Sequence, residues 1–381
     1  MAGIYVHVPF CTQRCTYCDF YFTTTRHNFG AFVQALEAEI EVYGQEFGGK
    51  EPIETLYFGG GTPSLLPLDE LARIMAAVEC HFDTSAICEV TLEMNPEEAK
   101  PPYLRGLRDL GITRLSLGVQ SFFDEDLRFM NRAHDAAQAE AAVEAVGRVF
   151  ETFSVDLIFG LPDQPFEYWG ANLEKAIRLG APHFSTYSLT VEERTPLAKQ
   201  VSRGLVEPAG DEAMRELFLF TMEYLTDRGY DHYEVCSFAK EGQRSLHNQA
   251  YWRHRNYLGF GPSAHSFWKT THSVAHRWSN VRNVNRYNAL LQQHELPLDE
   301  REALKPDMLA DEYLLLGLRL MQEGLDLNRL ETDYGVDLLT EKRTALADLE
   351  RNGLLTLRNN RVLLTREGAV VADAVALKLA E

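Results

Sequence analysis

The stretch VPFCTQRCTYCDFYF, residues 8–22, places three cysteines within eight positions. Cys11, Cys15 and Cys18 are spaced C-x3-C-x2-C, and the stretch contains no fourth cysteine. It overlaps the end of IYVHVPF (4–10), a short segment rich in β-branched and aromatic residues that predicts a strand. The three thiols are therefore expected on the loop that follows the first strand.

Three thiols this close together allow three interpretations. A structural zinc site would want a fourth ligand, such as His7 or a more distant histidine. A redox pair with C-x2-C spacing would leave Cys11 unexplained. An iron–sulfur cluster would use all three thiols, and a [4Fe–4S] cube held by three thiolates leaves one iron open to a small molecule. The apolar and aromatic neighbours Phe10, Tyr17 and Phe20 would shield such a cluster.

Strand-like and helix-like segments alternate across the first two-thirds of the chain. Such alternation predicts parallel strands joined by right-handed crossovers, in a sheet that is open or curled into a barrel. Polar groups or glycines recur where the predicted strands end, and in parallel α/β folds those ends form the ligand face. The strand-like segments are 4–10, 54–60, 87–95, 112–120, 153–162 and 183–189, and the clearest helical patterns are 29–44, 67–82, 136–150 and 165–180.

Charge and composition limit the partners and the compartment. The 381 residues include 56 acidic and 37 basic side chains, for a formal net charge of −19. Such a surface favours solubility and repels a phosphate backbone, so nucleic acid is not an expected partner. The chain shows no secretory signal and no run of about eighteen apolar residues that would predict a membrane helix. Because the other three cysteines are scattered, we expect a reducing, cytoplasmic location.

The pattern changes twice in the second half of the chain. A helix is expected at 211–228, followed by a segment rich in His, Trp and Tyr at 246–287. Further on, helices and a hairpin around Asn359-Asn360 resemble a winged-helix unit. Its hairpin is not strongly basic, which favours a structural or partner-docking role. The helices expected there are 307–322, 326–332, 337–351 and 365–379, and the predicted division of the chain is a core at 1–195, a segment that completes the barrel and lies near the ligand at 196–304, and a winged-helix-like unit at 305–381.

The C-x3-C-x2-C loop, with Tyr17 just before its last cysteine, resembles the radical S-adenosylmethionine superfamily. The resemblance implies a partial (β/α)6 barrel and a [4Fe–4S] cluster on Cys11, Cys15 and Cys18. It also implies that the amino and carboxylate groups of S-adenosylmethionine chelate the open iron. In that family an electron from the reduced cluster splits the sulfonium, leaving methionine and a 5′-deoxyadenosyl radical.

Other strand-end residues fit the same resemblance. The glycine run of YFGGGTPSLL (57–66) lets a ligand approach the backbone, and the resemblance assigns it to the methionine amino group; an ordinary tight turn is the alternative. A buried carboxylate needs a partner, which ribose hydroxyls or the methionine moiety would supply. Arg132 would pair with the carboxylate of that moiety, unless it is a solvated helix arginine. The residues expected to line the S-adenosylmethionine site are Tyr5, Tyr17, Gly60, Gly61, Thr62, Glu93, Gln120, Arg132 and Asp156.

Within that superfamily, the motifs IYVHVPFC, YFGGGTPS, LSLGVQSF and DLIFGLP resemble the oxygen-independent coproporphyrinogen III oxidases and their relatives. The chain departs from the oxidases in two places. They carry a further cysteine where this chain has Phe20, and an N-terminal extension where only ten residues precede Cys11. Both departures argue against decarboxylase activity.

The segment HNQAYW (247–252) carries the H-N-x-x-Y-W pattern and resembles the HemW-like haem chaperones, which bind haem and deliver it to haem-dependent membrane enzymes. A histidine can ligate haem iron, and aromatic rings offer a flat apolar wall to a porphyrin. His247 is therefore expected to ligate haem or lie beside it. The alternative is a hydrogen-bonded core corner that His247 forms with Asn248, Tyr251 and Trp252. His265, in GPSAHSF, is a second candidate, or part of a loop that closes over the barrel mouth.

Two functions of different classes follow. The first is a haem-trafficking protein that keeps the radical S-adenosylmethionine core and serves client proteins, membrane-bound ones among them. The second is an oxidase that removes hydrogen from a propionate of coproporphyrinogen III, after which loss of carbon dioxide and one electron leaves a vinyl group. Phe20, the short N-terminus and the H-N-x-x-Y-W pattern favour the first. No residue is assigned a catalytic role of its own, and the sequence leaves the client, the electron donor and the oligomeric state open, a homodimer included.

Overall fold

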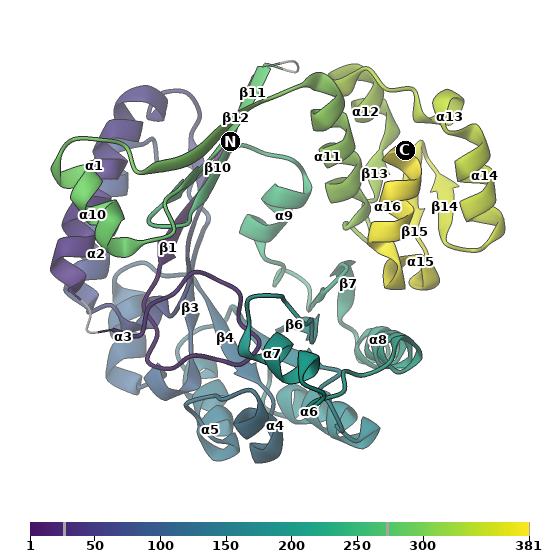
Figure 1. Ribbon diagram of the computed structural model, residues 1–381, viewed down its shortest axis with the longest axis horizontal. Helices are drawn as coiled ribbons and strands as arrows, with labels where there is room; N and C mark the ends of the chain where they lie inside the picture. The colour runs from purple at the N-terminus through teal and green to yellow at the C-terminus, as the bar shows by residue number, and fades with distance from the viewer. Residues whose placement is uncertain (26–27, 272–273, 381) are drawn as a thin grey trace.

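A twelve-stranded sheet runs through the main body of the molecule, and a smaller unit with a three-stranded sheet lies beside it (Figure 1). The computed structural model describes residues 1–25, 28–271 and 274–380. Positions 26–27 of the expected core, 272–273 of the aromatic-rich segment and residue 381 of the expected C-terminal unit lie outside the described residues.

Six parallel strands form the centre of the large sheet and follow one another in chain order. They confirm the predicted alternation of strands and helices and the α/β class. The strands are β1 (Ala2–Val8), β2 (Ile53–Gly60), β3 (Glu89–Met94), β4 (Arg114–Gln120), β5 (Phe153–Phe159) and β6 (His183–Ser188).

Side chains alternate between the two faces of these strands, as in any β-strand. In β1, Ile4, Val6 and Val8 are fully buried in the main hydrophobic core, whereas Tyr5 and His7 lie on the opposite face. The same alternation recurs along the sheet, so one face is aliphatic and the other is polar and aromatic. The polar face carries Tyr5, His7, Thr55, Tyr57, Glu89, Thr91, Glu93, Ser116, Ser154, Asp156, His183 and Ser185.

Helices cover the aliphatic face of the sheet. Phe32, Leu36 and Ile40 of the first helix belong to the main core, and Asn28 caps that helix by accepting a hydrogen bond from the Ala31 N–H. Among the described residues no helix is both long and apolar enough to cross a membrane. The helices of this body are α1 (Phe29–Phe47), α2 (Leu68–His81), α3 (Pro101–Asp109), α4 (Asp124–Phe129), α5 (Ala136–Gly147), α6 (Phe166–Arg178), α7 (Pro196–Ser202), α8 (Asp211–Thr226) and α10 (Val284–Gln292), with 3-10 turns at Pro63–Leu65 and Pro96–Glu98.

Residues after β6 extend the sheet at both edges. β9 pairs in parallel with β1 and is followed by antiparallel β10, β11 and β12, while β8 and β7 continue beyond β6. In the described residues the order ends at β12 and β7, so the barrel is partial, as predicted. The sequence does not predict these added strands. They are β7 (Asp231–Glu234), β8 (Ser237–Ala239), β9 (Tyr257–Phe260), β10 (His265–Thr271), β11 (Val274–Asn280) and β12 (Leu298–Leu304).

Helix α9 (Leu246–Trp252) holds the H-N-x-x-Y-W pattern and packs on β1 and β2. Its first turn is capped by Ser245, whose hydroxyl accepts a hydrogen bond from the Asn248 N–H. The helix lies between the large sheet and the C-terminal unit (Figure 1). It therefore has one side toward the polar face of the sheet and another toward that unit.

The C-terminal unit has the element order of a winged helix. Asn359 and Asn360 both have positive φ, 52° and 57°, as a two-residue type I′ turn requires, and this confirms the predicted hairpin. The helices expected at 337–351 and 365–379 are each split in two. The proposed boundary at 304/305 stays a prediction. The elements are α11 (Pro306–Leu318), β13 (Leu325–Asp326), α12 (Leu327–Tyr334), α13 (Leu338–Glu341), α14 (Arg343–Arg351), β14 (Leu355–Arg358), β15 (Arg361–Leu364), α15 (Arg366–Val370) and α16 (Ala372–Ala380).

Candidate functional site

The three-cysteine loop leaves the end of β1 and is held against the end of β2. The Gly61 N–H donates to the Val8 carbonyl at 2.8 Å, and the Thr62 N–H donates to the Phe10 carbonyl at 2.7 Å. The Cys11 N–H donates to the Thr23 carbonyl at 3.0 Å. Backbone hydrogen bonds on both sides of Cys11 therefore fix where the loop begins.

The glycine run makes this close contact between the two loops sterically feasible. Gly60 has φ +108°, and a Cβ there would lie 2.6 Å from the His7 ring. A Cβ on Gly61 would lie 2.7 Å from the Phe10 carbonyl oxygen. The backbone approach predicted for this run is present, but its partner is the neighbouring loop. Contact with a methionine amino group stays a prediction.

Two donors reach the thiols from neighbouring loops, one after β2 and one after α4. The Thr62 hydroxyl lies 3.6 Å from the Cys11 sulfur, and the Arg132 Nη1 lies 3.4 Å from the Cys15 sulfur. Burial raises the pKa of the Cys11 thiol to about 12 and that of Cys18 to about 11, and repulsion from the neighbouring thiolates adds to both rises. Holding three thiolates here therefore calls for a bound cation, which deprotonates its sulfur ligands.

The donor set fits an iron–sulfur cluster better than a single zinc ion. Among the described residues, no group of three or more His, Cys, Asp or Glu side chains is arranged to hold one metal ion. His7, the fourth zinc ligand considered from the sequence, has both ring nitrogens in hydrogen bonds, to the Tyr5 hydroxyl at 3.1 Å and the Tyr21 carbonyl at 2.9 Å. In a [4Fe–4S] cube each thiolate binds a different iron, so the three sulfurs need not converge on one point.

Arg132 lies just after α4 and is turned into the protein. Its Nη2 donates to the Asn95 side-chain oxygen at 2.6 Å and to the Gly118 carbonyl at 2.8 Å. It is therefore not the solvated helix arginine that was the alternative. Its Nε is buried and has no hydrogen-bond partner among the described residues. Its charge stands beside Cys15 and Tyr17.

Glu93 connects β3 to the end of β2. It accepts a hydrogen bond from the Tyr57 hydroxyl at 2.8 Å and one from the Gly60 N–H at 3.1 Å. Burial raises the pKa of Glu93 to about 7, and the nearby charge of Asp156 adds to the rise. The ring of Tyr5 stacks on that of Tyr57, with centroids 6.0 Å apart. The Glu93 carboxyl is thus partly buried and titrates close to physiological pH.

Two further strand-end groups have buried oxygen atoms without partners. Asp156 accepts a hydrogen bond from the Ser116 hydroxyl at 2.7 Å through Oδ2, but Oδ1 has no partner within the described part of the chain. Gln120, with φ +67° at the end of β4, likewise has a buried and unpaired Oε1. Burial raises the pKa of Asp156. Unpaired buried acceptors are costly, so both oxygens are positioned to take hydrogen bonds from a ligand.

We call this region the thiol edge. It brings together most residues that the sequence predicts for the cofactor site, and it adds others that the sequence did not assign to that site. The signal for the added residues is the alternation of polar side chains along each strand. The thiol edge consists of Cys11, Cys15, Cys18, Gly60, Gly61, Thr62, Glu93, Gln120, Arg132 and Asp156, and the added neighbours are His7, Tyr57, Asn95 and Ser116.

His247 is buried on the side of α9 that faces the sheet. Its Nδ1 is hydrogen-bonded to the Thr55 hydroxyl at 2.8 Å and its Nε2 to the Tyr251 hydroxyl at 2.9 Å, and its ring stacks on Tyr57 with centroids 4.9 Å apart. Burial lowers its pKa to about 3. His247 and Tyr251 thus form part of the hydrogen-bonded core corner considered as the alternative, whereas the Trp252 indole nitrogen has no hydrogen-bond partner among the described residues. Neither ring nitrogen of His247 is free for iron. A haem ligand at His247 stays a prediction that this geometry does not favour.

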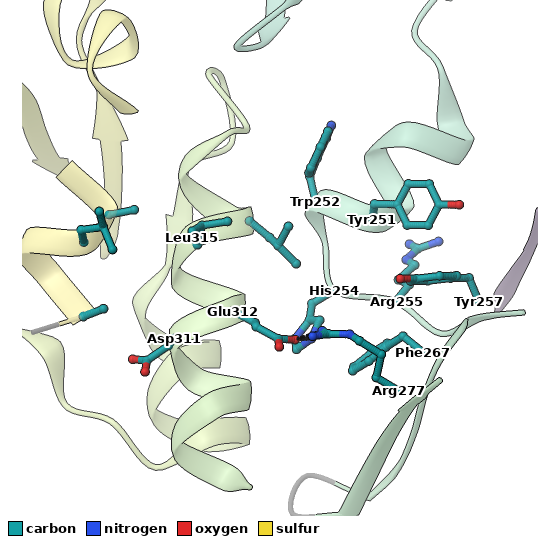
Figure 2. Close-up of a pocket in the computed structure, with 14 residues that line it drawn as sticks. Tyr251, Trp252, His254, Arg255, Tyr257, Phe267, Arg277, Asp311, Glu312 and Leu315 are labelled. Carbon is teal, nitrogen blue, oxygen red and sulfur yellow. Dashed lines mark hydrogen bonds and ion pairs between the residues drawn. The ribbon is translucent and has the colours of Figure 1, made fainter. Parts of the chain in front are cut away.

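On its other side, α9 borders an open pocket of about 590 Å³ (Figure 2). Tyr251 and Trp252 line it together with residues that no motif identified, which come from the turn after α9 and from β9, β10, β11, α11 and α16. We call it the α9 pocket. Its lining includes Tyr251, Trp252, His254, Arg255, Tyr257, Phe267, Arg277, Asp311, Glu312, Leu315, Leu316, Ala376 and Leu377.

Comparison with known proteins agrees with this fold. The model of the Radical SAM superfamily matches residues 5–176, and that of the HemN C-terminal domain matches residues 304–371. Coproporphyrinogen III oxidase (HemN) from Escherichia coli superposes with a TM-score of 0.82 over 99% of this chain and 89% of its own, at 23% identity. At that identity the likeness concerns the fold. Together these features define the chain as a radical S-adenosylmethionine protein.

Relatives that match over nearly the full length of the chain identify the family within this class. The haem chaperone HemW of Mycobacterium tuberculosis is 36% identical over 99% of this chain and 94% of its own length. HemW of Bacillus subtilis is 31% identical over 98% of each chain. The chain belongs to the HemW haem chaperone family.

Proposed function

We propose that this protein binds haem and delivers it to haem-dependent proteins, respiratory proteins in membranes among them. A [4Fe–4S] cluster and S-adenosylmethionine occupy the thiol edge under this proposal. The relatives named haem chaperones span nearly the whole chain, and the C-terminal unit is included in that match. This supports a shared function for the entire protein and not only for its core.

One observation carries the cofactor part of the proposal. Three thiols lie at one edge of the sheet together with three buried polar atoms that have no hydrogen-bond partner in the described part of the chain: Asp156 Oδ1, Gln120 Oε1 and Arg132 Nε. Thiolates hold iron–sulfur clusters, and unpaired buried oxygens need donors such as hydroxyl groups. The edge therefore offers a place for a cluster and, next to it, for a ligand with hydroxyl and carboxylate groups.

Each residue of the edge has a distinct role in this proposal. Cys11, Cys15 and Cys18 hold the cluster, which when reduced supplies one electron to the sulfonium of the cosubstrate. Thr62 and Arg132 donate to two of the sulfurs. The remaining residues would orient the cosubstrate. Asp156 and Gln120 would accept hydrogen bonds from its hydroxyl groups, Arg132 Nε would donate to its carboxylate, and Glu93, Gly60 and Gly61 would hold its amino group.

The test begins with protein whose cluster is reconstituted without oxygen. Haem is titrated and its Soret band followed, and the loaded protein is mixed with a haem-free acceptor. We expect stoichiometric haem binding and transfer to the acceptor. Absence of haem binding by the reconstituted wild-type protein would overturn the proposal.

A parallel incubation addresses the oxidase alternative, which shares the fold but lacks further support. Coproporphyrinogen III, S-adenosylmethionine and a low-potential reductant are supplied, and the products are separated by chromatography. We expect no divinyl product. Phe20, 70% exposed, stands where the oxidases carry a cysteine. Divinyl product over many turnovers would make the protein an oxidase.

A further inference from the structure

The α9 pocket has two apolar walls that come from different parts of the chain. Trp252 and Tyr251 of α9, with Tyr257 of β9 and Phe267 of β10, form an aromatic wall. The opposite wall is aliphatic and belongs to α11 and α16 of the C-terminal unit. In Figure 2, Leu315 of α11 lies across the pocket from Trp252. A space between two apolar walls suits a flat apolar ligand.

The volume of the α9 pocket and the exposure of its aliphatic wall indicate a ligand site rather than a packing defect. The volume of about 590 Å³ lies within the range of roughly 300–1,000 Å³ that small-molecule and cofactor sites occupy. Leu377 of α16 is 59% exposed and Leu315 is 39% exposed, so the aliphatic wall presents large side chains to solvent. A ligand that covers both would remove this apolar surface from water.

Charged groups gather at one end of the pocket. The Arg277 Nη2 pairs with the Glu312 carboxylate at 2.6 Å, and His254 Nε2 lies 3.4 Å from the same carboxylate. Arg255, also in the lining, pairs with Glu54. Figure 2 shows Glu312, His254 and Arg277 meeting there. Two guanidinium groups therefore lie in the pocket lining, each paired with a carboxylate, in a protein whose formal net charge is −19.

A ligand with a flat apolar body and carboxylates on one side matches both features. We infer that the α9 pocket is the porphyrin site, with the macrocycle between the aromatic wall and α11–α16 and a propionate paired with Arg277. This rests on the proposed haem-carrying function and specifies where haem binds. It moves the site from His247, whose ring nitrogens are both engaged, to the other side of α9.

The Glu312 carboxylate occupies Arg277 in the structure described here, so the propionate competes with it. A guanidinium can pair bidentately with one carboxylate and can also be shared between two. Binding therefore loosens a contact between the sheet extension, which carries Arg277, and the C-terminal unit, which carries Glu312. Occupancy of the pocket is thus coupled to how firmly that unit is held.

The first experiment tests the aliphatic wall by haem titration of the intact, cluster-containing protein. Leu377→Glu places a charge where the macrocycle would lie, and we expect haem affinity to fall tenfold or more. Leu339→Glu is the matched control: Leu339 lies in the same unit, is 41% exposed and is not part of the pocket lining. Its affinity should equal that of the wild type. Equal loss in both variants would be a general charge effect and would overturn the pocket assignment.

The second experiment tests the carboxylate contact with a residue–ligand cycle. Wild type and Arg277→Ala are each titrated with haem and with haem dimethyl ester, whose propionates cannot form the ion pair. We expect esterification and Arg277→Ala each to weaken binding about tenfold, with little further loss in combination. Additive losses would show that Arg277 does not contact the propionates.

The outcomes separate this inference from the function on which it depends. If the wild type binds no haem, the proposed function fails. If the wild type binds haem and both Leu377→Glu and Arg277→Ala bind it equally well, haem is carried elsewhere and the pocket assignment is wrong. His247→Ala, titrated alongside, should keep wild-type affinity; a lost Soret band in that variant alone would return the site to the sheet side of α9.

Discussion

The thiol edge and the α9 pocket lie on different sides of helix α9, and their residues lack different kinds of interaction. At the thiol edge, buried polar atoms such as Asp156 Oδ1 and Gln120 Oε1 have no hydrogen-bond partner among the described residues. In the α9 pocket the arginines and glutamates pair with one another, while Leu315 and Leu377 remain exposed. One region lacks hydrogen bonds and the other lacks apolar cover.

This difference indicates the chemistry of each ligand. An unpaired buried oxygen is relieved by a donor, so the thiol edge suits a small polar molecule with hydroxyl groups. Exposed aliphatic side chains opposite aromatic rings are relieved by a flat apolar molecule, so the pocket suits a porphyrin. His247 is not expected to bind either ligand, because both of its ring nitrogens already form hydrogen bonds.

The largest expected effect comes from Cys15→Ala, which should abolish cluster binding at the thiol edge and leave haem binding in the α9 pocket unchanged. Losing one of three thiolates removes an iron ligand and the partner of Arg132, so we expect iron content after reconstitution to fall to background. Haem affinity should not change. Metal analysis and haem titration on the same preparation measure both, and Cys80→Ala, at an exposed position on α2, is the control. Undiminished iron in Cys15→Ala would contradict the cluster assignment.

Next in size is Gly60→Ala, which tests the rigidity of the thiol edge. The positive φ disfavours alanine, and the added methyl would meet the His7 ring at 2.6 Å, which two hydrogen bonds hold in place. We expect the free energy of unfolding to fall by about 2–5 kcal/mol, measured by urea denaturation. Gly49→Ala is the matched control, because nothing lies within 4 Å of a Cβ there. Equal stability of the two variants would mean that the glycine run is not needed for packing.

A smaller effect is expected for Asp156→Ala on S-adenosylmethionine affinity. Losing one charged acceptor should weaken binding about tenfold, measured by calorimetry on the reconstituted protein. Ser116→Ala removes the hydrogen bond that orients Asp156 but leaves the carboxylate, so this variant should lose less S-adenosylmethionine affinity. An unchanged dissociation constant in Asp156→Ala would remove this residue from the cosubstrate site.

The parallel core could be predicted from the sequence because each strand is short, bounded and rich in β-branched residues. The polar groups at its strand ends could be predicted for the same reason, since parallel strands share an edge. By contrast, β12, with the sequence LDEREAL, is mostly exposed and charged, so it lacks the apolar alternation that predicts a strand. It forms because β11 pairs with it.

The α9 pocket could not be predicted because its charged end is assembled from distant segments. His254, Arg277 and Glu312 belong to three different parts of the chain, and only the packing of the C-terminal unit on the sheet extension brings them together. The H-N-x-x-Y-W pattern did identify α9, but not which side of it matters. That depends on the rotation of the helix: His247 faces the sheet and Trp252 lines the pocket.

The smallest expected effect is the change in the free energy of unfolding with pH, and its sign differs between the two regions. Burial raises the pKa of Glu93 to about 7, so its ionisation costs stability as the pH rises toward that value. Burial also acts to raise the pKa of Glu312, but the nearby His254 ring and the hydrogen bond from Arg277 outweigh it, so the pKa lies below its ordinary value. Glu312 therefore adds stability above the unfolded pKa that is lost as the pH falls through the folded one.

These signs predict which limb of the stability profile each variant changes. Glu93→Gln should flatten the fall in unfolding free energy between about pH 4.5 and 7, the unfolded and folded pKa values of Glu93. Glu312→Gln should flatten the rise with pH on the acid side and leave the neutral limb as in the wild type. Urea denaturation of the cluster-free protein across this pH range measures both. If Glu312→Gln instead altered the neutral limb, its carboxylate would not be held ionised by His254 and Arg277, and a propionate would find Arg277 free.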